Sequence, residues 1–192
     1  TPGCGVFKGI KEVEPGCALI CTANGIEHRQ YWKLECKEHT DNFEQTAEKV
    51  RFLVTDSVKR QLVSDVELCT FLSGGLDSSL ISSIVNSEFK KQGKLLHTFS
   101  VDYADNDKYF KASKFQPNSD PEFIRRMDSY LDGKHHWVII DTDELVPALF
   151  DAVKARDLPG MADVDASMLL LCKKIKEFAT VALSGECADE IF

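Results

Sequence analysis

A loop of small residues between an apolar run and an amphipathic segment constrains the fold more than any other feature of the sequence. The apolar run covers residues 66–72, and the loop that follows it reads Ser73-Gly74-Gly75-Leu76-Asp77-Ser78-Ser79. This order is typical of a strand that turns into a helix. Glycines let the backbone come close to a ligand, and free amides at a helix start favour bound anions. The segment therefore predicts a phosphate-binding loop at the end of a strand.

Asp77 is unexpected in an anion site, because a carboxylate repels phosphate. A divalent cation between the two groups removes the conflict, and nucleotide phosphates usually bring Mg²⁺. The loop lacks the Gly-Lys-Ser/Thr of a Walker loop and the G-x-G-x-x-G spacing of dinucleotide sites. One interpretation is a pyrophosphate cradle with its own metal ligand. The other is a tight turn in which Asp77 or Ser78 only caps the helix.

A second segment repeats the pattern about a hundred residues later. The apolar residues 181–183 run into Ser184-Gly185 and then into the acids Glu186, Asp189 and Glu190. An ordinary turn before an acid-rich helix start is the structural alternative. Two such loops at the carboxyl ends of strands are, however, where an open α/β sheet forms its ligand crevice.

The chain alternates between predicted strands and helices after residue 65, which predicts parallel pairing with helices on both faces of the sheet. The predicted strands are 66–72, 95–101, 135–140 and 179–183, and the predicted helices are 78–91, 120–131, 143–155 and 165–177. A long helix is predicted before them at 41–64, capped by Asp41 with Glu44 three residues on. A hairpin of strands 17–22 and 26–34, turning at Asn24-Gly25, precedes that helix. Residues 102–121 are polar and aperiodic and predict a loop near the crevice.

These motifs resemble those of a known family. Ser73-Gly-Gly-Leu-Asp-Ser78 resembles the PP-loop, S-G-G-x-D-S, of ATP pyrophosphatases, and Ser184-Gly-Glu-Cys-Ala-Asp-Glu190 resembles S-G-E-G-A-D-E in the synthetase domain of asparagine synthetases. Phe99-Ser100-Val101 and residues 156–165 are similar to further segments of that domain. Residues 7–16, with Tyr31-Trp32, are similar to the close of the glutaminase domain of the glutamine-dependent type. The resemblance covers nearly the whole chain and departs from the pattern at Cys187, where glycine is usual.

The resemblance implies an α/β fold of the adenine nucleotide alpha-hydrolase type, with residues 1–40 as the glutaminase tail and linker and 41–192 as part of the synthetase domain. It implies conversion of aspartate to asparagine through β-aspartyl-AMP, with ATP, Mg²⁺ and ammonia from glutamine. Asp77 and Asp189 would be the Mg²⁺ ligands, and Glu186 the base that takes a proton from ammonia. The nucleotide would be bound by Leu72, Ser73, Gly74, Gly75, Asp77, Ser78, Val101, Ser184 and Gly185. The chain alone is expected to bind ATP weakly and to make little asparagine.

Composition narrows the classes of function. A net charge of -8 and a pI near 5.1 argue against an extended nucleic-acid surface. Neither an apolar membrane span nor a signal peptide is evident, so we expect a protein of the cytoplasm without a membrane partner. A homodimer is compatible with the resemblance, which leaves the oligomeric state open.

The cysteines are seven in number, without a CxxC pair. Cys4, Cys17, Cys21 and Cys36 gather near the start, but Cys17, Leu19 and Cys21 alternate as one strand face would. We therefore expect buried thiols in a reducing compartment rather than a metal site.

Two other functions stay open from the sequence. A related amide-forming synthetase, of the β-lactam synthetase or peptide cyclase type, would use the same two motifs on a different carboxylate. A PP-loop enzyme that modifies tRNA is disfavoured by the acidic composition.

Overall fold

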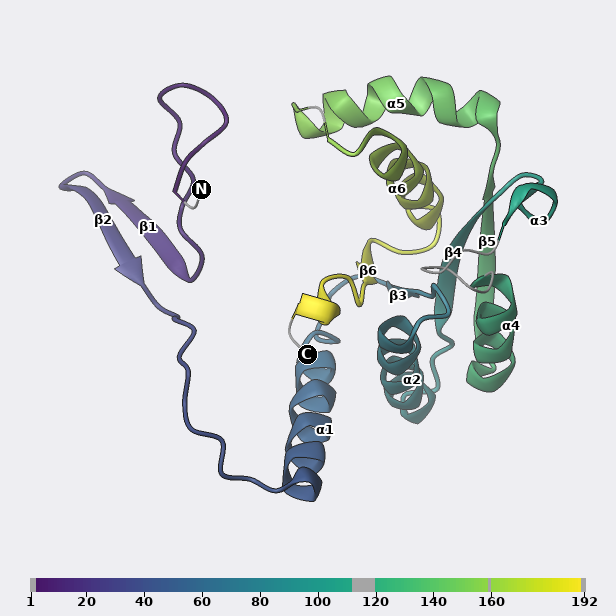
Figure 1. Ribbon diagram of the computed structural model, residues 1–192, viewed down its shortest axis with the longest axis horizontal. Coiled ribbons are helices and arrows are strands. Elements are labelled where there is room, and N and C mark those ends of the chain that lie inside the picture. Colours follow the sequence, from purple (N-terminus) through teal and green to yellow (C-terminus); the bar gives the residue numbers. More distant parts are fainter. Residues whose placement is uncertain (1–2, 112–119, 159, 191–192) are drawn as a thin grey trace. The chain divides into compact units, whose positions relative to one another are not determined.

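The computed structural model describes residues 3–111, 120–158 and 160–190 and divides the chain into two compact units, Thr1–Thr46 and Ala47–Phe192. Figure 1 shows the elements of each. Among the described residues, the helices are too short or too polar to cross a bilayer.

The first unit holds an antiparallel hairpin of β1 (Cys17–Thr22) and β2 (Gly25–Gln30). Thr22 pairs with Gly25, so the turn consists of Ala23 and Asn24 and lies one residue before the predicted Asn24-Gly25 turn. The second strand ends at Gln30 rather than at residue 34. Cys17 and Leu19 lie on one face, as the alternation predicted.

Helix α1 (Phe43–Arg60) begins with a capping box, although not the predicted one. The amide of Gln45 donates to Asn42 Oδ1 at 2.9 Å, and the amide of Asn42 donates to Gln45 Oε1 at 3.0 Å. The prediction of Asp41 and Glu44 was therefore wrong by one residue. The two pairs have the same spacing, and the sequence pattern could not separate them.

The second unit is built on a parallel sheet of four strands in the order β5-β4-β3-β6. The strands are β3 (Leu68–Phe71), β4 (His97–Tyr103), β5 (Lys134–Ile140) and β6 (Val181–Leu183). The helices around them are α2 (Leu76–Lys91), α4 (Asp120–Leu131), α5 (Thr142–Arg156) and α6 (Ala162–Ile175). This arrangement confirms the predicted parallel sheet.

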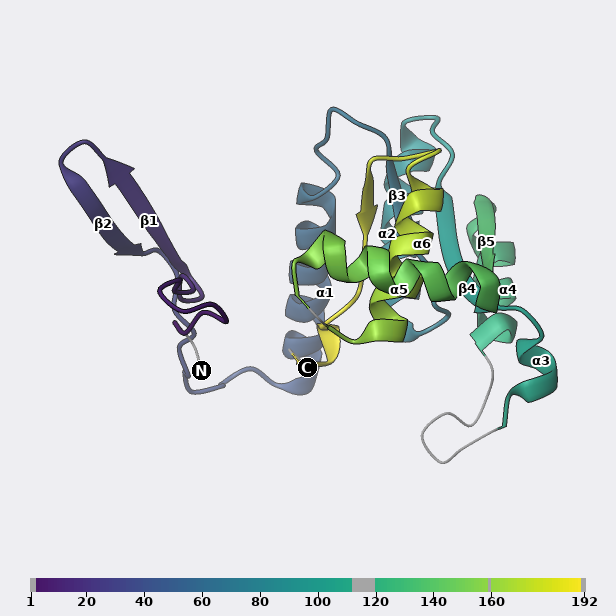
Figure 2. The ribbon, with the colours of Figure 1, turned by 90° about the horizontal axis from the view of Figure 1, so that it is seen from above.

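Helices cover both faces of the sheet, as Figures 1 and 2 show. Alternate residues of β3 point to opposite faces. Leu68 packs with α1 and α2 in one core cluster, whereas Cys69 packs with α6 in another. Leu72 packs with Ile124 and Leu131 of α4. Helix α5 lies on α6 through alanines of both helices.

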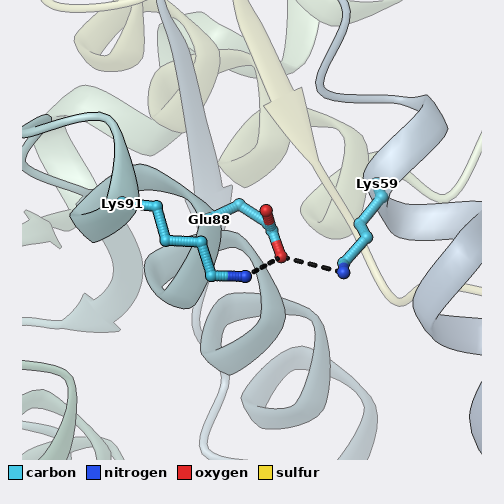
Figure 3. A network of polar contacts seen from close by, with 3 residues as sticks. All are labelled: Lys59, Glu88 and Lys91. Carbon is cyan, nitrogen blue, oxygen red and sulfur yellow. Dashed lines mark hydrogen bonds and ion pairs between the residues drawn. The ribbon is translucent and has the colours of Figure 1, made fainter.

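Polar contacts join α2 to α1 and to strand β3. Glu88 of α2 accepts from Lys91 at 2.8 Å and pairs with Lys59 of α1 at 3.0 Å (Figure 3). The hydrogen bonds from Lys91 and then Lys59 lower the pKa of the Glu88 carboxyl. In the interior, Thr70 of β3 and Ser82 of α2 share a hydrogen bond of 2.8 Å. These contacts set how α2 lies against the sheet.

Two parts of the second unit differ from the predictions. Strand β4 continues to Tyr103, and the segment predicted as a loop contains the short helix α3 (Asn106–Tyr109). Asp102 Oδ1 accepts hydrogen bonds from the amide of Tyr103 and from Asn106 Nδ2, which anchors this turn. Residues 112–119 of that segment lie outside the described residues.

The expectation of buried thiols was wrong for most cysteines. Cys69 is fully buried, and desolvation raises its pKa to about 12, so the thiol stays protonated. Cys17 is half-buried, and Cys4, Cys21, Cys36, Cys172 and Cys187 are exposed.

Cys187 has a left-handed backbone with φ of 67°. It lies between β6 and the one-turn helix η1 (Ala188–Glu190). A Cβ is unfavourable in this conformation, whereas glycine adopts it freely. The residue that departs from the family pattern therefore stands where glycine is physically favoured.

We expect Cys187→Gly to raise the free energy of unfolding by about 1 kcal/mol, because the left-handed backbone no longer carries a Cβ. Urea unfolding measures the change. Cys187→Ala is the matched control, since it removes the thiol and keeps the Cβ. Equal stabilisation by both variants would assign the effect to the thiol and contradict the prediction.

A histidine cluster lies at the amino ends of β4 and β5, at the opposite end of these strands from the Ser73 loop. His97 Nδ1 and His136 Nε2 share a hydrogen bond of 2.9 Å, and His136 stacks on Phe99 at 4.5 Å. His135 Nδ1 bonds Thr98 Oγ1 at 2.7 Å. The other ring nitrogen of His135, Nε2, is buried without a hydrogen-bond partner among the described residues. Desolvation is the main cause that lowers the pKa of all three imidazoles.

Acidification should therefore destabilise the second unit. The unfolded histidines take up protons near pH 6.5, whereas the folded ones resist protonation, so stability falls as pH drops from about 6.5 toward the folded pKa values. Urea unfolding at about pH 7.5 and about pH 5.5 measures the loss. His136→Phe, which keeps the stacking and cannot titrate, should lose less stability than the unmodified chain. In metal-free buffer the exposed His28→Gln serves as control, and an equal loss in both variants would exclude the cluster as the cause.

Candidate functional site

The two predicted loops leave neighbouring strands at the same edge of the sheet. β3 and β6 pair in parallel from Leu68↔Val181 to Thr70↔Leu183, so their carboxyl ends are adjacent. Gly185 lies directly against the first turn of α2. A Cβ on Gly185 would come 2.8 Å from Asp77 Cβ and 3.1 Å from the amide nitrogen of Ser78. Only glycine permits this approach, and the second loop therefore contacts the first.

The two loops line one cavity of about 260 Å³. Ser73, Gly75, Asp77 and Ser78 come from the first loop, and Ser184, Gly185 and Glu186 from the second. Phe71 of β3 and Met168 of α6 complete the lining. Seven of the predicted site residues are thus brought together.

Hydrogen bonds from Ser78 hold the first loop in shape. The buried Ser78 Oγ accepts from the amide of Ser73 at 3.2 Å, bonds Ser73 Oγ at 2.9 Å and donates to the carbonyl of Gly75 at 3.2 Å. Gly75 is the N-cap of α2 and makes no side-chain capping bond. The alternative in which Asp77 or Ser78 caps the helix was therefore wrong, and Ser78 braces the loop instead.

Gly74 serves a different purpose from its neighbours. Its φ is 81°, and a Cβ there would come 2.9 Å from Phe123 Cβ and 3.1 Å from the amide nitrogen of Ile124. It does not line either of the cavities that flank Ser73. The glycine lets the loop pack against the first turns of α4.

A second cavity, of about 290 Å³, adjoins the first through Phe71, Ser73 and Met168. Its lining includes Leu72 and Val101, the residues that the family resemblance assigns to adenosine. The lining is mostly apolar, as a site for a flat heterocyclic base would be. Backbone bonds position its wall, because the amide of Leu72 donates to the carbonyl of Phe99 at 2.8 Å and Ser100 Oγ donates to the carbonyl of Leu72.

Several residues of the second cavity escaped the sequence analysis. Tyr103 and Ser167 share a hydrogen bond of 2.8 Å between β4 and α6, and both line the cavity with Asp120 and Met168. Met168 also packs against the core cluster that holds Cys69 and Phe99. The position of Tyr103 two residues after Val101, on the same strand face, is the one signal that could have indicated it.

The acids of the site are placed unequally. Asp77 is half-buried and lines the first cavity, and its carboxylate makes no hydrogen bond or ion pair with another described residue. The exposed Glu186 lines that cavity and also a larger one of about 490 Å³ against α1. The exposed Asp189 lies in η1 and is not part of the first cavity's lining.

The donor set of the first cavity fits a hard cation. Its lining has two carboxylates and serine hydroxyls, and no Lys, Arg or His is among the described residues that form it. Mg²⁺ takes oxygen ligands and is held in nucleotide sites by one or two carboxylates together with phosphates. A triphosphate in this cavity would need such a cation to offset Asp77 and Glu186.

We expect Gly185→Ala to lower the free energy of unfolding by about 1–3 kcal/mol, because the methyl group would overlap the backbone of α2. Gly75→Ala is the matched control from the same site. Its Cβ would meet only Ser73 Oγ, at 3.4 Å, and its stability should change by about 0.5 kcal/mol or less. Chemical denaturation compares the two, and equal losses would contradict the close approach of the loops.

Comparison with known proteins gives consistent results. The model of the family described as asparagine synthase matches residues 49–192. Asparagine synthetase [glutamine-hydrolyzing] 3 of Bacillus subtilis is 54% identical over 100% of this chain and 31% of its own length. Asparagine synthetase [glutamine-hydrolyzing] 1 of the same organism is 31% identical over 95% of this chain and 27% of its own. Amidase chyE of Penicillium rubens is 30% identical over 97% and 29%. The chain spans about a third of these relatives' length, and it belongs to the asparagine synthase family.

Proposed function

We propose that this chain carries the nucleotide-binding part of a ligase that converts aspartate to asparagine with ATP. The observation that carries the proposal is the single cavity lined by both serine-glycine loops and by the carboxylates of Asp77 and Glu186. The family membership and the glutamine-hydrolysing relatives of Bacillus subtilis support the choice of reaction. Ammonia would come from glutamine, which the names of those relatives describe as hydrolysed by them.

The first step activates a carboxylate, because hydroxide is too poor a leaving group for direct amide formation. The side-chain carboxylate of aspartate attacks the α-phosphorus of ATP, the bond from that phosphorus to the β-phosphate oxygen breaks, and pyrophosphate leaves. Ser73, Gly74, Gly75 and Ser78 of the first loop would hold the departing pyrophosphate through amides and hydroxyls. Ser184 and Gly185 would contact the nucleotide from the second loop, and Leu72 and Val101 would hold the adenosine. Such a step depends mainly on positioning and fixed dipoles.

Asp77 and Asp189 are the proposed Mg²⁺ ligands, and bound Mg²⁺ would neutralise charge on the phosphates. Asp77 already lines the cavity. Asp189 lies three residues after Glu186 on the exposed turn η1, and its carboxylate would need to turn toward the cavity. Asp77 is therefore expected to matter more for metal affinity than Asp189.

The second step forms the amide. Ammonia attacks the acyl carbon of β-aspartyl-AMP, AMP leaves, and the new nitrogen loses a proton. Glu186 is the proposed base, because its carboxylate lines the same cavity as the pyrophosphate loop. The proposed setting is the cytoplasm, with aspartate, ATP and glutamine as small-molecule partners and no nucleic acid. A homodimer is compatible with this reaction.

Substitutions should separate the two steps in a full-length protein that carries this sequence. Asp77→Asn removes the charge that would hold Mg²⁺, so aspartate-dependent pyrophosphate release should fall about a hundredfold or more. Glu186→Gln should retain pyrophosphate release and lose asparagine formation by about a hundredfold. Enzymatic pyrophosphate detection and amino-acid analysis follow the two products.

The exposed Asp143→Asn, in the first turn of α5, is the matched control and should leave both products unchanged. Normal turnover by Asp77→Asn and Glu186→Gln would refute the assigned roles. Pyrophosphate release that depends on another carboxylic acid and not on aspartate would refute the substrate.

A further inference from the structure

The hairpin of the first unit has little to stabilise it by burial. Among described residues 3–46 no side chain is buried, and every position of β2 is exposed. Isolated two-stranded hairpins are marginally stable in water. Small units of this kind commonly gain stability from a disulfide or a metal ion, and the cysteines here are free thiols.

One face of the hairpin brings three metal-ligating side chains together. The register pairs Cys17 with Gln30 and Leu19 with His28, so Cys17 and His28 are diagonal neighbours on one face. Glu14 joins them through a turn in which the amide of Cys17 donates to the carbonyl of Glu14 at 3.1 Å. A carboxylate oxygen of Glu14, Cys17 Sγ and a ring nitrogen of His28 all lie within 4.8 Å of one another.

Backbone hydrogen bonds between the segments that flank the hairpin help to hold these three side chains together. Gly16, next to Cys17, accepts hydrogen bonds from the amides of Tyr31 at 2.9 Å and Trp32 at 3.1 Å, which closes the base of the hairpin. Glu14 and His28 are exposed and Cys17 is half-buried, so an ion could reach all three from solvent.

Sulfur, nitrogen and oxygen donors together select the class of ion. Mg²⁺ and Ca²⁺ take oxygen ligands, whereas Zn²⁺ accepts thiolate, imidazole and carboxylate at about 2.0–2.3 Å. Tetrahedral ligands at those lengths are about 3.3–3.7 Å apart, so the side chains must close by roughly 1 Å. Rotation of exposed side chains is enough for that change.

We propose that Glu14, Cys17 and His28 form a binding site for one divalent transition-metal ion of the Zn²⁺ type, with a water molecule in the fourth position. Binding replaces the proton of the Cys17 thiol by the metal and releases that proton to solvent. The ion joins the segment before β1 to both strands and so stabilises the hairpin. The cysteine-only site weighed from the sequence is not the one that forms, because Cys17 lies with a histidine and a glutamate rather than with Cys4, Cys21 or Cys36.

Titration of the whole chain with Zn²⁺ and Co²⁺ tests this site. We expect one ion per chain and, with Co²⁺, a thiolate-to-cobalt charge-transfer band. Cys17→Ser should abolish that band and weaken Zn²⁺ binding about tenfold or more, and His28→Gln should weaken binding by a similar factor. Zn²⁺ should also slow proteolysis within residues 14–30 of the unmodified chain but not of Cys17→Ser.

Matched controls separate this site from others on the chain. Cys21→Ser removes a thiol from the same face of β1, and Cys187→Ser removes the thiol beside Glu186; both should bind Zn²⁺ like the unmodified chain. The proposal is overturned if Cys17→Ser keeps the cobalt band, if either control loses it, or if the unmodified chain binds no ion. Because all these side chains are at least partly exposed, circular dichroism should show each variant folded.

Discussion

The close contact between Gly185 and the first turn of α2 is the constraint on which the rest of the site depends. It requires that β3 and β6 be neighbours, because only then do the two loops begin side by side. It also requires a residue without a side chain at position 185. The shared cavity, the presence of Asp77 and Glu186 in its lining and the fit to a hard cation all follow from this contact. A sheet with any other strand inserted between β3 and β6 would separate them.

The sequence predicted the architecture well because local and long-range signals agreed. Apolar runs that alternate with amphipathic segments leave a parallel sheet as the simple solution, and every predicted strand of the second unit is present. Element ends were less accurate. α6 begins at Ala162 rather than at residue 165, and α1 ends at Arg60 rather than at 64. Ends depend on capping contacts, and the choice between Asn42 and Asp41 as cap shows that spacing alone cannot determine them.

The sequence predicted the two loops of the candidate site, whose small residues shape the backbone. It did not predict the contacts between side chains within the site. Motif spacing indicated the two loops. It could not show that Ser78 would be used to brace Ser73, or that Tyr103 would meet Ser167 across the second cavity. Both are long-range or rotamer-dependent contacts, which periodicity does not encode. The Glu14, Cys17 and His28 cluster was missed for a similar reason, because the turn before β1 and the strand register together produce it.

The brace inside the first loop has a consequence for recognition. The buried Ser78 hydroxyl takes part in three hydrogen bonds, as acceptor from the Ser73 amide, as partner of Ser73 Oγ and as donor to the Gly75 carbonyl, and these hold the loop in shape before a ligand binds. The conformational entropy of that backbone is therefore lost when the chain folds and not when a ligand binds. The binding free energy of an anion is reduced less by ordering of the loop. The loop from Ser73 to Ser78 therefore offers a ligand a preformed backbone. Any adjustment to the shape of the ligand falls to the exposed residues Glu186 and Asp189 of the second loop.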